Sequence, residues 1–163
     1  MQVKHLIAAA AIACAATGAS AATYLMGDVT AAGGFSFDSS SLSGSFSDTY
    51  VFSIADLSDL SISVTNAFTT TNGKIASFAG LLSGPGLAGS ALGLTTIGKM
   101  QVLSGDLSTA MGGEYTLTLS GSAMGTGYYG GVASVSPVPE PETYGLMLAG
   151  LGAIAFVARR RLS

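Results

Sequence analysis

Polar and apolar residues alternate with a period of two along much of this chain, a pattern typical of strands with one buried face. The alternation is clearest in three segments, Phe46–Ile54, Leu60–Thr65 and Tyr115–Ser120. Weaker segments of the same kind are Thr23–Thr30, Gly33–Asp38, Lys74–Leu82, Lys99–Leu103 and Tyr129–Val135. The pattern therefore predicts at least eight strands.

Clusters of Gly and Ser separate these segments, at residues 39–45, 83–93 and 121–127. Such clusters predict turns and loops. The cluster at 83–93 is long enough to be a loop or an irregular edge strand. Many short strands with one polar face predict an all-β fold, an antiparallel β-sandwich of jelly-roll-like type.

Asp48 interrupts the pattern, because alternation places it on the apolar face of the segment 46–54. A buried carboxylate without partners is costly. We therefore expect Asp48 to accept hydrogen bonds from loop amides or from a hydroxyl group. The alternative is a calcium ligand, since Ca²⁺ takes oxygen ligands; the candidate co-ligands are Asp38, Asp56 and Asp59.

The N-terminal segment has the layout of a secretory signal peptide. Lys4 precedes the apolar stretch Leu6–Ala16, and small residues follow, with Ala19-Ser20-Ala21 as a cleavage motif. The pattern predicts a signal-peptide helix within residues 1–22 and a mature chain that begins near Ala22 or Thr23. Cleavage just before Cys14, as in a lipoprotein, is the alternative; it would leave an unusually short apolar stretch.

The C-terminal segment, residues 137–163, has a second distinctive layout. Prolines on both sides of Glu140 favour an extended backbone, and 16 uncharged residues separate Glu142 from Arg159. As a helix they span roughly 24 Å, less than the ~30 Å bilayer core, so a spanning helix needs local thinning. Three arginines end this stretch and predict a cytoplasmic end with the body on the far side: Arg159, Arg160 and Arg161. The alternatives are an ordinary tail anchor and a buried core helix.

Pro139-Glu140-Pro141, the apolar helix and the arginine cluster together resemble the PEP-CTERM sorting signal. The resemblance implies recognition by a membrane protease of the exosortase type. It also implies export, transient membrane anchoring with the body on the periplasmic side, and then a place at the cell surface or outside the cell.

A second resemblance lies in the body of the chain. Phe46-Ser47-Asp48-Thr49-Tyr50 is similar to the FxDxF-type subgroup of PEP-CTERM proteins, with Tyr50 in place of the second Phe. This resemblance implies a surface-associated protein of a bacterium that makes exopolysaccharide. The subgroup has no established biochemical activity to transfer.

Charge and composition narrow the function of the body, residues 23–136. Seven acidic residues stand against Lys74 and Lys99, so the clustered cations that nucleic acid binding needs are missing. The only His and the only Cys, His5 and Cys14, lie in the predicted signal peptide. The body therefore cannot build a Ser-His-Asp or Cys-His catalytic site, a zinc site of the usual type, or a disulfide.

We therefore predict a non-enzymatic matrix or surface protein without a cofactor, associated with exopolysaccharide in a biofilm. The alternative is a glycan- or calcium-binding module tethered at the envelope. In either case, tyrosines such as Tyr128 or Tyr129 are candidates to contact sugars. The abundant Ser and Thr residues are candidates for O-glycosylation.

Overall fold

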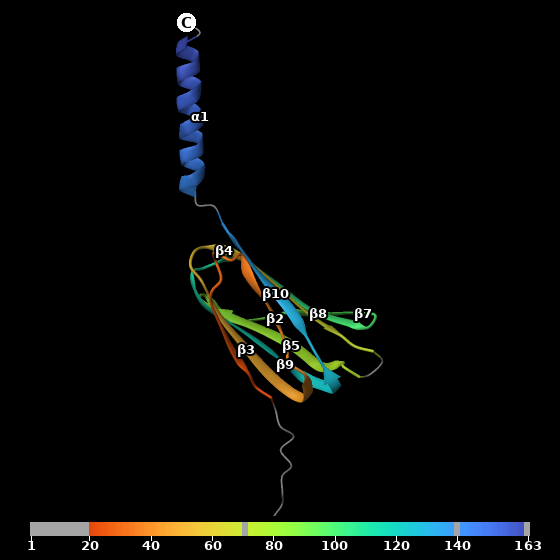
Figure 1. Ribbon diagram of the computed structural model, residues 1–163. Helices are drawn as coiled ribbons and strands as arrows, with labels where there is room; N and C mark the ends of the chain where they lie inside the picture. The colour runs from red at the N-terminus through yellow and green to blue at the C-terminus, as the bar shows by residue number, and fades with distance from the viewer. Residues whose placement is uncertain (1–19, 70–71, 139–140, 162–163) are drawn as a thin grey trace, which may run out of the picture.

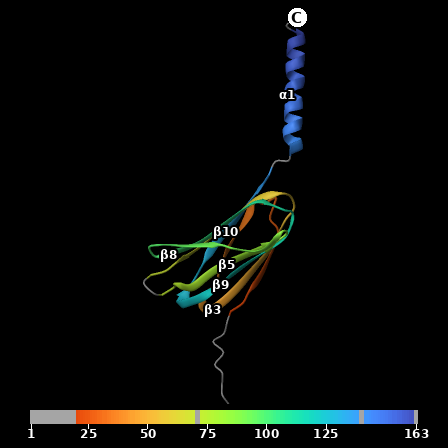
Figure 2. The ribbon, with the colours of Figure 1, turned by 180° about the vertical axis from the view of Figure 1, so that it is seen from behind.

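The computed structural model describes residues 20–69, 72–138 and 141–161; the signal peptide predicted over residues 1–22 lies outside them except for Ser20–Ala22. The described chain forms ten strands in two five-stranded sheets, followed by one helix (Figures 1 and 2). The first sheet has the order β1 (Thr23–Asp28), β3 (Leu42–Ile54), β9 (Gly113–Gly127), β5 (Ile75–Gly84), β6 (Leu87–Ala91). The second has the order β2 (Gly34–Asp38), β10 (Gly130–Pro137), β4 (Ser58–Ala67), β8 (Met100–Ala110), β7 (Gly93–Ile97).

The mostly β prediction is confirmed, and all eight predicted segments are strands. Several are longer than predicted, most of all β9, which continues through the Gly-rich cluster at 121–127. The reason lies in packing. A Cβ atom on Gly121 would come within 2.4 Å of the Ile75 side chain and 3.3 Å of the Phe46 ring. Glycine here permits close approach inside a paired strand and does not end it.

The cluster at 83–93 also differs from a plain loop. Its middle forms β6, the edge strand of the first sheet, and Gly93 begins β7, the edge strand of the second sheet. Leu92 lies between them and is buried. All five residues of β7 are exposed, so no alternation of polar and apolar positions marked this strand in the sequence.

The fully antiparallel arrangement predicted from the sequence is wrong at one edge. β1 runs parallel to β3, with Thr23 opposite Thr49 and Tyr24 opposite Tyr50. The pairing extends back to Ser20, which forms an isolated parallel bridge with Phe46. Parallel strands need a crossover connection, and β2, which lies in the other sheet, provides it.

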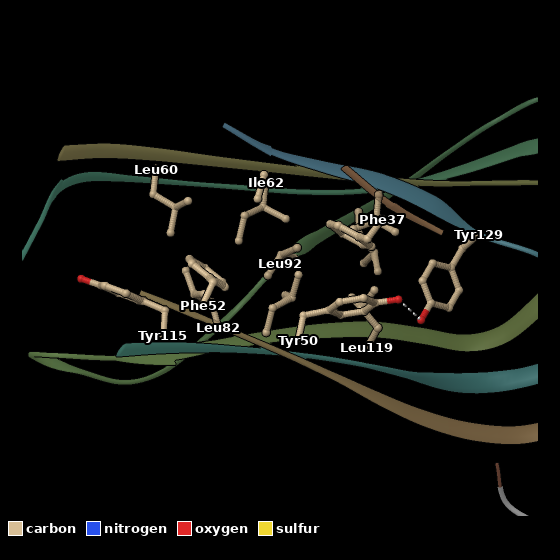
Figure 3. Packing of buried hydrophobic residues seen from close by; sticks show 14 of the residues in the cluster. Phe37, Tyr50, Phe52, Leu60, Ile62, Leu82, Leu92, Tyr115, Leu119 and Tyr129 are labelled. Atoms are coloured by element: carbon tan, nitrogen blue, oxygen red, sulfur yellow. Dashed lines mark hydrogen bonds between the residues drawn. The ribbon is translucent and has the colours of Figure 1, made fainter. Parts of the chain in front are cut away.

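The core lies between the two sheets, where the apolar faces of both meet (Figure 3). Aromatic rings from opposite sheets pack against each other in tilted pairs: the ring centroids of Phe37 and Tyr50 are 4.4 Å apart, and those of Phe35 and Phe52 are 5.1 Å apart. These contacts join β2 of one sheet to β3 of the other. Burial of these large aromatic side chains, together with the aliphatic residues of the core, stabilises a body that contains no cysteine and so no disulfide.

A single helix, α1 (Pro141–Arg161), follows the sheets and extends away from them (Figure 1). Side chains from Glu142 to Ile154 are exposed. The predicted helix exists; among the described residues, no helix is long and apolar enough to cross a membrane.

Candidate functional site

The Asp48 carboxylate lies on the buried face of β3 and is only 2% exposed. Its Oδ1 atom accepts a hydrogen bond from the backbone nitrogen of Ala22 at 3.1 Å. Its Oδ2 atom accepts a short hydrogen bond of 2.6 Å from the Tyr129 hydroxyl. An amide and a hydroxyl are the two kinds of donor that the sequence led us to expect. Bonds of this kind, with an ionised acceptor, are shorter and stronger than neutral ones.

The Tyr129 hydroxyl also lies 2.9 Å from the Tyr50 hydroxyl (Figure 3). Because the single Tyr129 proton is directed at Asp48, the Tyr50 hydroxyl donates to the Tyr129 oxygen. The result is a chain of hydrogen bonds from Tyr50 through Tyr129 to Asp48, which links strand β3 to the segment just before β10. Tyr50 replaces the second Phe of the FxDxF-type pattern, and its hydroxyl has a partner here.

The environment of this cluster favours neutral tyrosines. Burial raises the pKa of Tyr50 to about 12; the hydrogen bond with Tyr129 acts in the opposite direction, and the nearby Tyr24 and Asp48 raise the pKa further. Burial also raises the pKa of Tyr129, and the hydrogen bond to Asp48 raises it further. Both phenols therefore remain protonated at neutral pH and act as hydrogen-bond donors. A buried, fully paired cluster of this type serves structure, since neither oxygen of Asp48 faces solvent.

The structure does not support the alternative assignment of Asp48 as a calcium ligand. Within residues 20–69, 72–138 and 141–161, no three His, Cys, Asp or Glu side chains gather in a way that could hold a metal ion. The proposed co-ligands do not gather around Asp48 into such a group. Asp59, for example, is exposed and accepts a hydrogen bond from the Thr109 backbone nitrogen at 3.0 Å.

Among the other buried polar residues, Gln101 and Asn66 were not singled out from the sequence. Gln101 on β8 makes paired hydrogen bonds with the backbone of Ile75 on β5, of 3.0 and 2.9 Å, and so ties one sheet to the other. The Asn66 side chain donates to the carbonyl oxygens of Gly73 and Tyr128. The sequence did contain a signal for the burial of Asn66, because this residue continues the alternating apolar face of β4 beyond Val64.

The outer face of the second sheet carries a hollow of about 330 Å³. Its walls come from β4, β8 and β10: Asp59, Leu60, Ser61, Asp106, Leu107, Ser108, Ser134 and Ser136. Strand pairing sets Ser134 beside Ser61, and Ser61 beside Asp106. Serine and aspartate residues of three adjacent strands therefore surround the hollow, although most of its accessible lining is apolar.

The tyrosines proposed to contact sugars have different positions. Tyr128 is 54% exposed, but Tyr129 is 3% exposed and belongs to the buried cluster. The prediction of a sugar contact at Tyr129 is therefore wrong. The cause is local: β10 begins at Gly130, just after Tyr129, and the Tyr129 backbone nitrogen bonds to Ser39 Oγ, which turns its ring inward.

The predicted sorting tail begins at the end of β10. Pro137 is the last residue of that strand, and the Val138 backbone nitrogen donates to the Leu57 carbonyl oxygen at 3.0 Å. Pro139 and Glu140 lie outside the described residues, and Pro141 begins α1. The arginine cluster forms the last turn of α1, where Arg159 is exposed. The described part of the tail thus consists of the end of β10, Val138 and the helix α1.

Comparison with known families identifies this tail. Residues 137–161 match the model of the PEP-CTERM protein-sorting motif. The match does not extend to the segment Phe46–Tyr50, so membership of the FxDxF-type subgroup stays a prediction. No curated protein matches the chain.

Two solved structures resemble the body. One is the pre-peptidase C-terminal domain of a collagenase from Bacillus anthracis, with 19% identity and a TM-score of 0.46, covering 70% of this chain and 94% of that chain. The other is a periplasmic inhibitor of g-type lysozyme from Aeromonas hydrophila, with 15% identity and a TM-score of 0.38, covering 72% of this chain and 100% of that chain. Both identities are too low to transfer a function.

Proposed function

We propose that this chain is an exported protein that an exosortase-type membrane protease sorts through its C-terminal segment. The observation that carries the proposal is the sorting-motif match at residues 137–161. Two features of the sequence add support: the signal-peptide pattern of residues 1–22 and the prolines on both sides of Glu140. A segment with proline on both sides of Glu140 resists helix formation and suits a protease cleft. After export, the C-terminal segment holds the protein at the membrane until it is processed.

The body, residues 23–136, is proposed to be a jelly-roll-like β-sandwich. The strand orders support this assignment: β2-β10-β4-β8 lies in one sheet and β3-β9-β5-β6 in the other. Consecutive strands from β2 to β5 and from β8 to β10 therefore alternate between the sheets, the connectivity of two nested Greek keys. β1 and β7 are additional edge strands.

The processed body is proposed to act without catalysis, as a matrix or surface component that binds exopolysaccharide. Sugars are recognised by groups that can both donate and accept hydrogen bonds, and the Ser-lined hollow on the second sheet supplies them. The acidic residues Asp59 and Asp106 at this hollow disfavour an anionic polymer. They favour a neutral polysaccharide, or one that is held through bridging cations.

Processing is tested by replacing Pro139 and Pro141 with Ala in the native host. The variant is expected to stay full length in the inner membrane fraction, because the connection to α1 can then become helical. Replacement of Pro137, which lies in β10, is the matched control and leaves the cleavage segment unchanged. Normal release of the Pro139→Ala, Pro141→Ala variant would contradict the proposal.

Polysaccharide binding is tested by retention of the processed protein on the host's own exopolysaccharide. Ser61→Gln fills the hollow with a neutral side chain and is expected to reduce retention. Ser47→Gln, at an exposed position of β3 on the other sheet, is the matched control and is expected to leave retention unchanged. Equal retention of both variants would rule out the hollow as the polysaccharide-binding site. Release of shortened sugar chains would rule out the non-enzymatic function.

A further inference from the structure

The donor to Asp48 Oδ1 is the backbone nitrogen of Ala22, the residue directly after the predicted cleavage motif Ala19-Ser20-Ala21. In the uncleaved chain this nitrogen is a neutral amide. The carbonyl oxygen of Ala22 accepts a hydrogen bond from the Thr49 backbone nitrogen at 2.8 Å, which holds residue 22 in register with β3. The nitrogen of Ala22 is thus fixed 3.1 Å from a carboxylate oxygen that is otherwise buried.

Cleavage after Ala21 would change the chemistry of this contact. Water adds across the peptide bond, so that the carbonyl carbon of Ala21 gains a hydroxyl group and leaves as a carboxylate. The nitrogen of Ala22 gains a proton to become an amine and, at neutral pH, a second proton from solvent to become an α-ammonium group. A positive charge then lies where the amide hydrogen pointed at Asp48.

We propose that signal-peptide cleavage after Ala21 converts the hydrogen bond between the Ala22 nitrogen and Asp48 into an ion pair, so that this buried carboxylate acquires its counter-charge only in the processed protein. The other donor to Asp48 is the neutral Tyr129 hydroxyl. A buried carboxylate with neutral donors alone is compensated less well than one with a cation in contact. The contact between Ala22 and Asp48 therefore becomes charged on both sides only after the signal peptide is removed.

The contact depends on the position of the cut. A chain that begins at Ala21 keeps the neutral amide at Ala22 and carries its charge one residue further away. A chain that begins at Thr23 has no Ala22 nitrogen. The chains that begin at Ala21 and at Ala22 both lack Ser20. Both therefore lose the backbone hydrogen bonds that Ser20 makes with Ser45 and Ser47, and this loss does not affect the comparison between them.

The test compares two chains that lack the signal peptide but keep the C-terminal tail, residues 22–163 and 21–163, which differ by one alanine. Each is produced with an initiating Met that is removed before Ala, and both are purified in the same mild detergent. The readout is the rate at which an acylating reagent modifies the α-amine, followed by mass spectrometry. An ammonium group in contact with a carboxylate loses its proton less readily, so we expect roughly tenfold slower modification in 22–163.

The same pair is then compared with Asp48→Asn, which keeps the size and one acceptor oxygen of the side chain. The slow modification of 22–163 is expected to disappear, while the rate for 21–163 stays unchanged. If Asp48→Asn does not fold, the comparison of the two wild-type chains decides alone. Equal rates in the wild-type pair would overturn the proposal, and so would a mature N-terminus other than Ala22 in protein exported by the native host.

Discussion

Replacing Tyr129 by Phe removes one oxygen atom from the centre of the buried hydrogen-bond chain. The ring remains, so its stacking on Phe46, with centroids 5.7 Å apart, is kept. Two hydrogen bonds are lost: the 2.6 Å bond to Asp48 and the 2.9 Å bond from Tyr50. Asp48 keeps only its bond from Ala22, and the Tyr50 hydroxyl loses its acceptor.

The expected cost follows from the kind of each bond. A hydrogen bond to a charged group contributes about 1.5–3 kcal/mol, and a neutral one about 0.5–1.5 kcal/mol. Tyr129→Phe is therefore expected to lower the free energy of unfolding by about 2–4.5 kcal/mol. Tyr50→Phe removes only the neutral bond and leaves Asp48 with both donors, so its expected cost is about 0.5–1.5 kcal/mol.

Denaturant unfolding of both variants, followed by tyrosine fluorescence and by circular dichroism, measures this difference. The midpoint is expected to fall much further for Tyr129→Phe than for Tyr50→Phe, with the denaturant dependence unchanged. Equal losses in the two variants would show that the bond to Asp48 carries no special weight. A loss below about 0.5 kcal/mol for Tyr129→Phe would refute the reasoning altogether.

Three further predictions follow from the same core. Asp48→Ala should lower the unfolding free energy by about 1–3 kcal/mol through unsatisfied partners; an unchanged midpoint would contradict this, and melting that depends on calcium would restore the metal hypothesis. Because the pKa of Tyr50 is raised to about 12 in the folded protein, its contribution to stability is complete below the ordinary phenol value of about 10 and should be lost as the pH rises from about 10 to 12. Spectrophotometric titration that shows all tyrosines ionising near pH 10 in the folded protein would contradict it. Gly121→Ala should cost about 1–3 kcal/mol by overpacking against Ile75, whereas Gly93→Ala, where a Cβ atom meets only an ordinary contact, should cost less than Gly121→Ala in the same thermal melts.

The alternation of residues predicted the strands that contribute to the core, because one face of each is buried. Asp48 was also placed correctly, since it shares the apolar face of β3 and a buried carboxylate needs donors. The identity of its partners could not be predicted. Ala22 and Tyr129 are 26 and 81 residues away along the chain, and only the pairing of β1 with β3 and the approach of β10 bring them together.

Where prediction from the sequence was wrong, the cause is tertiary packing that overrides local residue preference. Gly121 lies inside a strand because a side chain would not fit against Ile75. β7 lies at the edge of its sheet with every residue exposed, so its sequence shows no buried face. Tyr129 was assigned to the surface beside Tyr128, but the start of β10 turns it into the core. The hollow on the second sheet draws on three strands, and the order of those strands cannot be read from the sequence.

The central claim is that this chain is exported and then sorted through its C-terminal segment. The most direct measurement is the intact mass of the protein recovered outside the inner membrane of its native host. We predict a chain that begins at Ala22 and ends between Pro139 and Glu142, with any excess mass in multiples of sugar units. A recovered mass that includes α1 and its arginine cluster, or that includes residues 1–21, would contradict the account.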